Sequence, residues 1–270
     1  ALSSVFNEQG TLHKTNYFID YTLHDDLALL LTTSGSTGSP KFVRQSYKNV
    51  NSNAEAIAQY LGITSADRPI TTMPMSYSYG LSIINSHLLK GASIILTDAT
   101  LMDRSFWEEF RNNNATTFGG VPYIFEMLKK LHFERMNLSS LKYITQAGGK
   151  LSLELSASFA EICENQGIEF YVMYGQTEAT SRMSYLPSKY AQSKAGSIGM
   201  AIPGGKFWLE DENKNIIKKS NSIGQLVYQG DNVTMGYAEN CFDLQNGDEN
   251  HGILHTGDLA KRDSDGFYYI

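Results

Sequence analysis

Cysteine, basic charge and long hydrophobic runs are all scarce in this sequence. Two cysteines, Cys163 and Cys241, argue against a disulfide framework in a chain of 270 residues. The 22 lysines and arginines are outnumbered by 28 acidic residues and never form runs longer than two, so no nucleic acid partner is expected. No apolar run approaches the roughly 18 residues that cross a bilayer, and residues 1–20 lack a signal-peptide pattern. We therefore expect no membrane span and a cytoplasmic location.

The remaining pattern is that of an α/β protein with a large core, since 41% of the residues are hydrophobic and 19% are charged. From Leu27 onward, strand and helix patterns alternate, which predicts a mostly parallel sheet with flanking helices. The expected strands are 27–32, 69–73, 93–97, 116–118, 143–145 and 168–173, and the expected helices are 46–60, 79–90, 103–112, 122–131 and 151–166.

After about residue 182 short strands separated by turns take over, which predicts a small antiparallel β-barrel or sheet. These strands are expected at 207–210, 225–228, 233–237, 252–255 and 267–270. We therefore expect an α/β subdomain over 27–181 and a β-rich subdomain over 182–270, with residues 1–26 as the remnant of an upstream region. The six histidines are expected to be structural, because none forms a pair at metal-ligand spacing.

The most informative stretch is LLLTTSGSTGSPK, residues 29–41. An apolar strand that ends in a Gly/Ser/Thr loop can wrap an anion with successive backbone N–H groups. The spacing excludes a Walker loop, because Pro40 precedes Lys41 and Phe42 occupies the place of the magnesium-binding hydroxyl. The sequence therefore predicts a phosphate loop of another kind, with a polar surface turn as the alternative. Its expected ligands are Gly35, Gly38, Lys41 and the hydroxyls of Thr32, Thr33, Ser34, Ser36, Thr37 and Ser39.

Four further segments follow strands and carry unusual residues: 73–80, 147–151, 174–178 and 255–258. Ligands in open α/β sheets bind beyond the carboxyl ends of parallel strands, so such segments are candidates for one site. The first offers Tyr77 and Tyr79 before Gly80, and the last puts Asp258 at an expected strand end. Each one alone is equally compatible with an ordinary turn or a solvated surface.

Together the motifs TTSGSTGSPK, PMSYSYG, YGQTEAT, GQLVYQGDNVTMGY and HTGDLA, in this order, resemble those of the adenylate-forming superfamily. That superfamily includes acyl-CoA synthetases, adenylation domains of non-ribosomal peptide synthetases and firefly luciferase. The resemblance covers roughly residues 27–270 and is closest to the large-domain core of an acyl-CoA synthetase. It implies a ligase in which a carboxylate attacks the α-phosphate of Mg·ATP, giving acyl-AMP and pyrophosphate, and a thiol then takes the acyl group.

The resemblance also implies roles for individual residues. It places the loop from Thr33 to Lys41 around the β- and γ-phosphates, Thr177 at the α-phosphate, Glu178 on Mg²⁺ and Asp258 on the ribose hydroxyls. The implied nucleotide-binding residues are Thr33, Ser34, Gly35, Ser36, Thr37, Gly38, Lys41, Gly148, Gly149, Lys150, Tyr174, Gly175, Gln176, Thr177 and Asp258. Within this set Gly148, Gly149 and Lys150 would lie on one face of adenine and Tyr174 on the other, and the catalytic residues would be Thr177, Glu178 and Lys41.

The acyl substrate is expected near Tyr77, Tyr79 and Gly80. Amino-acid-activating members usually carry an aspartate in this motif, and residues 76–79 have none. Because an unpaired ammonium in an apolar pocket is costly, a fatty acyl or aryl carboxylate is favoured. An amino acid stays open as an alternative, with the counter-charge supplied by Asp98, Glu126 or Asp231.

The implied thiol acceptor is CoA or the phosphopantetheine of an acyl carrier protein. The family continues past the Asp258 motif to an arginine, a hinge and a small C-terminal domain with a lysine that promotes adenylate formation. We therefore expect this chain to bind nucleotide but to be poorly active alone. A catalytically silent adenylate-binding module is the alternative from a different class of protein.

Overall fold

The structure, a computed structural model, describes residues 3–7, 10–14, 21–33 and 41–270. Its α-helices are α1 (Tyr47–Tyr60), α2 (Ser78–Leu89), α3 (Arg104–Asn112), α4 (Pro122–Lys130) and α5 (Leu153–Gln166). Its short 3-10 helices are η1 (Phe133–Arg135), η2 (Thr177–Ala179), η3 (Ser188–Tyr190) and η4 (Cys241–Gln245). None of the helices in the described ranges is long and apolar enough to cross a membrane.

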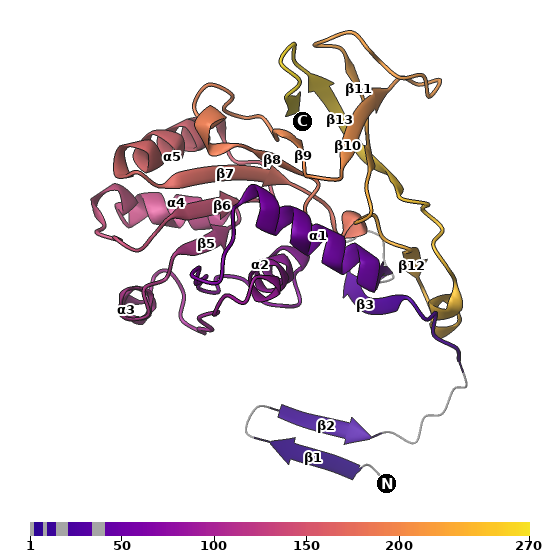
Figure 1. The fold of residues 1–270 in the computed structure, drawn as a ribbon, viewed down its shortest axis with the longest axis horizontal. Helices are drawn as coiled ribbons and strands as arrows, with labels where there is room; N and C mark the ends of the chain where they lie inside the picture. The colour runs from indigo at the N-terminus through magenta and orange to yellow at the C-terminus, as the bar shows by residue number, and fades with distance from the viewer. Residues whose placement is uncertain (1–2, 8–9, 15–20, 34–40) are drawn as a thin grey trace.

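The largest sheet has the order β5-β6-β7-β8-β9 and forms the centre of the body (Figure 1). Its strands are β5 (Thr117–Gly120), β6 (Tyr143–Gln146), β7 (Glu169–Tyr174), β8 (Ser184–Leu186) and β9 (Met200–Ala201). β5, β6 and β7 are parallel, whereas β8 and β9 add antiparallel strands at one edge. Single parallel bridges, Pro69 with Thr117 and Ile70 with Ile95, extend the other edge.

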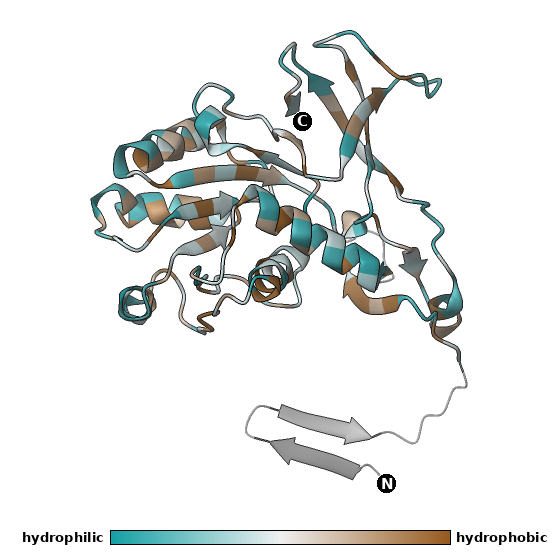
Figure 2. Cartoon of the chain, viewed as in Figure 1, coloured by the Kyte–Doolittle hydropathy of each residue, from teal (hydrophilic) through white to brown (hydrophobic). Residues whose placement is uncertain are grey.

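Helices cover both faces of this sheet because its central strands are apolar on both sides. Phe170 and Val172 of β7 face the core built with α3, α4 and α5, whereas Tyr171 and Met173 face the core built with α1 and α2. This alternation follows the period of two in a strand. In Figure 2, hydrophobic residues colour most of β7, whereas α1 carries both hydrophilic and hydrophobic bands.

A second sheet has the order β12-β4-β3, with β3 (Leu27–Thr32), β4 (Phe42–Ser46) and β12 (Gly236–Ala238) all antiparallel. β3 and β4 flank the predicted phosphate loop, so the loop's two ends lie side by side. Ser46 caps α1, with its hydroxyl accepting from the backbone N–H of Asn49, and Gly62 follows the helix at φ 62°.

A third sheet curls beside the body with the order β10-β11-β13-β14, from β10 (Lys206–Glu210), β11 (Ile223–Gln229), β13 (Ile253–Arg262) and β14 (Tyr268–Tyr269). Two hydrogen bonds between Tyr268 and the 198–199 segment join it to the body. Separately, β1 (Ser3–Asn7) and β2 (Gly10–Lys14) pair as an antiparallel hairpin.

The expected α/β body followed by a small antiparallel sheet is confirmed, but several details were wrong. The 27–32 strand forms as expected yet pairs antiparallel in the second sheet, and its partner β4 was not predicted. Segments 69–73 and 93–97 form only single bridges, and 233–237 contributes only the start of β12, which pairs with β4. β8 and β9 continue the main sheet beyond residue 182, so the two expected subdomains share it.

A buried histidine should make the stability of this fold depend on pH. The His87 ring lies between Ile83 O (2.7 Å from Nδ1) and the Tyr143 hydroxyl (3.0 Å from Nε2), and burial lowers its pKa to about 4. As the pH falls from the ordinary value near 6.5 toward 4, the unfolded chain binds a proton that the folded chain does not. We expect the free energy of unfolding to fall by about 3 kcal/mol across this window.

Urea unfolding at a series of pH values would measure this contribution. The slope should be smaller in His87→Gln than in the wild type, and unchanged in His251→Gln, which replaces an exposed histidine. Equal slopes in His87→Gln and the wild type would show that His87 does not cause the pH dependence.

Candidate functional site

A cavity of about 300 Å³ lies where the end of β7 meets β13. Segments far apart in the sequence form its walls: the end of β6 with the turn after it, the end of β7 with the turn after it, the loop before β9, and β13, with Ser156 of α5 and Ile270 after β14 completing the lining. The lining residues are Gln146, Gly148, Gly149, Lys150, Leu151, Ser156, Val172, Met173, Tyr174, Gly175, Gln176, Gly196, Ser197, Ile198, Asp258 and Ile270. Seven of the residues predicted to bind nucleotide are therefore on one surface.

The carboxylate of Asp258 is held at this wall by two side chains from the end of β7. The Tyr174 hydroxyl donates to Oδ2 at 2.6 Å, and Gln176 Nε2 donates to the same oxygen at 3.1 Å and to Thr256 O at 3.0 Å. Burial, with the carboxylate beside it, raises the pKa of Tyr174, so the hydroxyl stays a donor. Oδ1 of Asp258 accepts no hydrogen bond from the described part of the chain, which leaves it available to a ligand.

A bulge in β13 directs Asp258 toward the cavity. The expectation that Asp258 ends a strand was wrong, because β13 continues to Arg262. The register with β11 shifts between Gln225 and Val227, so residues 256–258 lie opposite Leu226 alone. Gly257 takes the left-handed conformation there at φ 78°, and Thr256 Oγ1 donates to Leu226 O at 2.8 Å.

Two glycines in the cavity wall allow close approaches that a side chain would block. A Cβ on Gly148 would lie 2.3 Å from the hydroxyl of Tyr77, so Tyr77 reaches the segment predicted to contact adenine. A Cβ on Gly175 would lie 1.7 Å from Ser181 O, so the turn between Tyr174 and Gln176 requires glycine. This turn leads directly into η2 and its functional candidates.

Thr177, Glu178 and Lys41 form a second group next to the cavity. Thr177 Oγ1 lies 3.2 Å from Ser78 Oγ, and Glu178 Oε1 accepts from the Tyr237 hydroxyl at 2.8 Å. Lys41 Nζ lies 5.9 Å from the centre of the Tyr237 ring and pairs with Glu239 at 2.6 Å. Tyr237, from β12, therefore links the lysine and the carboxylate.

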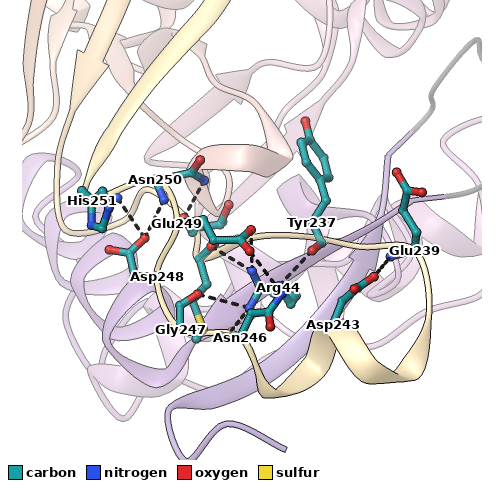
Figure 3. A network of polar contacts seen from close by, with 12 residues as sticks. Arg44, Tyr237, Glu239, Asp243, Asn246, Gly247, Asp248, Glu249, Asn250 and His251 are labelled. Atoms are coloured by element: carbon teal, nitrogen blue, oxygen red, sulfur yellow. Dashed lines mark hydrogen bonds and ion pairs between the residues drawn. The ribbon is translucent and has the colours of Figure 1, made fainter.

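Arg44 contacts β12, the strand that carries Tyr237, and the 246–249 segment (Figure 3). Its side chain is fully buried, donates to the carbonyl oxygens of Met235, Tyr237, Asn246 and Gly247, and pairs with Glu249 Oε2 at 2.8 Å. Because Met235 precedes β12 and Tyr237 lies within it, Arg44 fixes the strand that carries the Tyr237 side chain.

Some predicted site residues lie elsewhere. Tyr79, on the buried face of α2, donates its hydroxyl to Thr145 O at 2.9 Å, and Gly80 packs against Pro74 O. Thr33 lies at the end of β3, and Ser34, Gly35, Ser36, Thr37 and Gly38 lie outside the described residues. The acids considered for an ammonium partner, Asp98, Glu126 and Asp231, are all exposed and absent from the cavity lining.

The prediction missed Tyr237, Arg44 and the 196–198 segment. Tyr237 lies within a quoted motif, so its aromatic ring was a detectable signal, but its partner Glu178 is 59 positions away. Nothing in the local pattern of the 42–46 segment indicates that Arg44 would bind carbonyls about 200 positions further on.

Comparison with known families matches residues 8–238 to the AMP-binding enzyme family. The chain belongs to this family, and the match agrees with the motifs and with the convergence of their residues on one cavity.

Among individual proteins, the chain is 31% identical to 2-succinylbenzoate–CoA ligase of Bacillus mycoides (strain KBAB4), over 93% of this chain and 50% of that protein. It is 27% identical to o-succinylbenzoate CoA synthetase (MenE) from Bacillus subtilis in complex with the acyl-adenylate intermediate OSB-AMP, with a TM-score of 0.78 over 92% of this chain and 49% of that one. The same enzyme in complex with ATP and magnesium ion gives 26% identity and a TM-score of 0.78, over 96% and 52% of the two chains. The chain thus spans about half the length of the curated relatives it matches.

Replacing Arg44 should destabilise the protein. In Arg44→Met the carbonyl oxygens of Tyr237, Asn246 and Gly247 and the Glu249 carboxylate lose their bonds to the guanidinium, whereas Met235 O keeps the backbone N–H of Glu249. Each unsatisfied buried acceptor costs about 1–3 kcal/mol. We expect the free energy of unfolding in urea to fall by about 3 kcal/mol or more, with Arg44→Lys intermediate because an ammonium lacks the planar fork.

Arg104→Met is the matched control for this experiment. Arg104 is 92% exposed and makes only an i,i+4 pair with Glu108, so its loss should change stability by less than about 0.5 kcal/mol. Unfolding curves that coincide for Arg44→Met and Arg104→Met would contradict the anchoring role.

Proposed function

We propose that this protein is an AMP-forming ligase that activates a carboxylic acid with Mg·ATP as an acyl-adenylate and transfers the acyl group to the thiol of CoA. The observation that carries the proposal is the Asp258 carboxylate at the wall of the cavity, with Oδ2 fixed by Tyr174 and Gln176 and Oδ1 open. A carboxylate held in this way can accept hydrogen bonds from two adjacent sugar hydroxyls.

The rest of the cavity suits the adenosine part of the ligand. Gly148 and Gly149 present bare backbone on one side, and Tyr174 presents an aromatic ring on another. A planar base can lie between such surfaces, because glycine permits close approach and an aromatic face stacks. The cavity of about 300 Å³ lies at the lower end of the usual range for small-molecule sites.

The second group of residues suits the phosphates and the metal. In the described ranges, no cluster of three His, Cys, Asp or Glu residues could hold a metal on its own. This fits magnesium, which proteins commonly bind through one or two carboxylates together with substrate phosphates and water. Glu178 would be that carboxylate, and Mg²⁺ when bound would neutralise charge on the phosphate oxygens.

Each residue then has a definite task when the substrate carboxylate attacks the α-phosphorus and pyrophosphate leaves. Thr177 would donate its hydroxyl to an α-phosphate oxygen, and Lys41 would exchange its exposed pair with Glu239 for the phosphates. Tyr237 would hold the Glu178 carboxylate in orientation through its hydrogen bond. Preorganised donors of this kind commonly contribute on the order of 10²–10³ in rate each.

The substrate is proposed to be an aryl carboxylic acid. The reported relatives are named for 2-succinylbenzoate and CoA, which favours an aryl acid over a fatty acid and CoA over a carrier-protein phosphopantetheine. The exposed positions of Asp98, Glu126 and Asp231 leave an amino-acid substrate without the counter-charge that it would need.

Calorimetry with AMP tests the nucleotide site directly. Asp258→Asn should bind AMP about 10- to 100-fold more weakly than the wild type, because hydrogen bonds to a charged group contribute about 1.5–3 kcal/mol. Asp98→Asn, an exposed aspartate away from the cavity, should bind like the wild type. No AMP binding by the wild type, or equal binding by Asp258→Asn, would refute the assignment of the site.

Titration with ATP in the presence and absence of Mg²⁺ tests the metal ligand. Glu178→Gln should lose most of the gain in ATP affinity that Mg²⁺ gives the wild type, while its AMP affinity stays the same. Glu126→Gln provides the matched control on the exposed face of α4. A magnesium effect that survives in Glu178→Gln would transfer the role to another residue.

A further inference from the structure

Ser156 is a buried serine whose hydroxyl has no hydrogen-bond partner among the described residues. It lies in the first turn of α5 and is 2% exposed, and its backbone N–H makes the ordinary helical bond to Ser152 O at 2.8 Å. Leaving a buried hydroxyl unsatisfied is unfavourable, and alanine would avoid that cost at the same place in the helix. The hydroxyl itself therefore calls for an explanation.

Two other helical serines show how such a hydroxyl is normally satisfied. Ser52 of α1 donates to Asn49 O at 3.1 Å. Ser82 of α2 donates to Tyr79 O at 2.7 Å. In both helices the acceptor is a carbonyl oxygen of the preceding turn. Ser156 makes no such bond, so its hydroxyl is available to the cavity that it lines.

The cavity lined by Ser156 is the proposed adenosine cavity of about 300 Å³. Val172 and Tyr174 of β7 line it as well, and two positions along a strand correspond to about 7 Å on one face. Tyr174 donates to Asp258, whereas Val172 packs in the core that includes α5. The cavity therefore extends along β7 from the Asp258 carboxylate to the helix that carries Ser156.

This direction is the one that a purine nucleotide bound through its ribose would follow. With the ribose hydroxyls on Asp258, the base extends away from that carboxylate, and the 6-amino group of adenine lies on the edge remote from the ribose. Leu151, Val172 and Ile198 supply apolar surface around the ring. A polar group on the remote edge then needs a polar partner at the α5 end of the cavity.

Ser197, the other serine in the lining, already has its hydrogen bonds within the protein. Its hydroxyl donates to Tyr268 O at 2.7 Å and accepts from the backbone N–H of Gly199 at 2.9 Å. Of the two serine hydroxyls that line the cavity, only that of Ser156 has its bonding capacity unused.

Gln146, at the end of β6, adds a second acceptor to the lining. Its Nε2 donates to Gly149 O at 2.8 Å, which fixes the orientation of the amide, and Oε1 accepts no hydrogen bond from the residues that the structure describes. An amide oxygen can only accept, whereas a hydroxyl can accept or donate. Together they suit a ligand group that has hydrogens to donate, such as an amino group, better than an oxo group.

We propose that the Ser156 hydroxyl accepts a hydrogen bond from the 6-amino group of the adenine base, so that α5 contributes to the selection of adenine nucleotides. The inference rests on the proposed function, because it assumes that Asp258 binds the ribose. It assigns a task to a buried polar group that neither its helix nor its packing requires.

Calorimetric binding of two nucleotides to the wild type and Ser156→Ala tests this contact. The nucleotides are AMP and purine riboside 5′-monophosphate, which is AMP without the 6-amino group. Ser156→Ala should bind AMP about fivefold more weakly than the wild type does, as expected for one hydrogen bond between neutral groups. Its affinity for purine riboside 5′-monophosphate should equal that of the wild type. Ser158→Ala, on the same helix but outside the cavity lining, should bind both nucleotides like the wild type.

The same measurements separate this contact from the proposed function. If the wild type binds AMP but Ser156→Ala weakens the binding of both nucleotides equally, or of neither, the contact with the amine is refuted and the proposed function stands. If Ser156→Ala failed to fold, Ser156→Cys would provide the same comparison, because a thiol of similar shape forms only weak hydrogen bonds. Failure of the wild type to bind AMP would count against the proposed function itself.

Discussion

The buried guanidinium of Arg44 makes the contacts on which the arrangement of the proposed phosphate side of the site depends. β4 follows the predicted phosphate loop, whereas β12 lies about 190 positions later, and their pairing spans only three residues on each strand. Such a short ladder contributes few hydrogen bonds, so the bonds from Arg44 to the carbonyl oxygens of Met235 and Tyr237 are a large part of the contact. Because Tyr237 then donates to Glu178, the chain of contacts runs from one buried cation to the proposed metal ligand.

The two fully buried arginines of the described residues differ in how their charge is compensated. Arg44 is enclosed by carbonyl oxygens and a carboxylate of the protein itself, which is a complete set of partners. Arg182 is enclosed by hydroxyls, a thioether and an aromatic face, which reduce the cost of its burial but do not balance its charge. The first arrangement includes a counter-ion, whereas the second relies on neutral partners alone among the described residues.

The sequence motifs predicted the cavity better than they predicted the strands around it. Gly148, Tyr174 and Asp258 converge as expected, because each ends or interrupts a strand where backbone and side chains face the same edge. β4 escaped prediction because its residues FVRQS include a buried arginine and glutamine, and because its partners are set by pairing over long sequence distances rather than by local pattern. The strand end predicted at Asp258 is instead a bulge inside β13. Gly257 indicated a local bend, but a glycine bend is compatible with both a strand end and a bulge.

The short segment 174–182 connects the proposed adenosine side of the site to the proposed phosphate side. Tyr174 and Gln176 hold Asp258, the next residues Thr177 and Glu178 are at the proposed phosphate and metal positions, and Arg182 ends the segment with a bond to Ser82 of α2. The segment is confined at both bends, by the contact of Gly175 with Ser181 O and by the left-handed backbone of Thr180 at φ 65°. A rigid turn that carries the proposed ribose and phosphate contacts fixes their spacing, which is a condition for a carboxylate and an α-phosphate to meet in a reactive geometry.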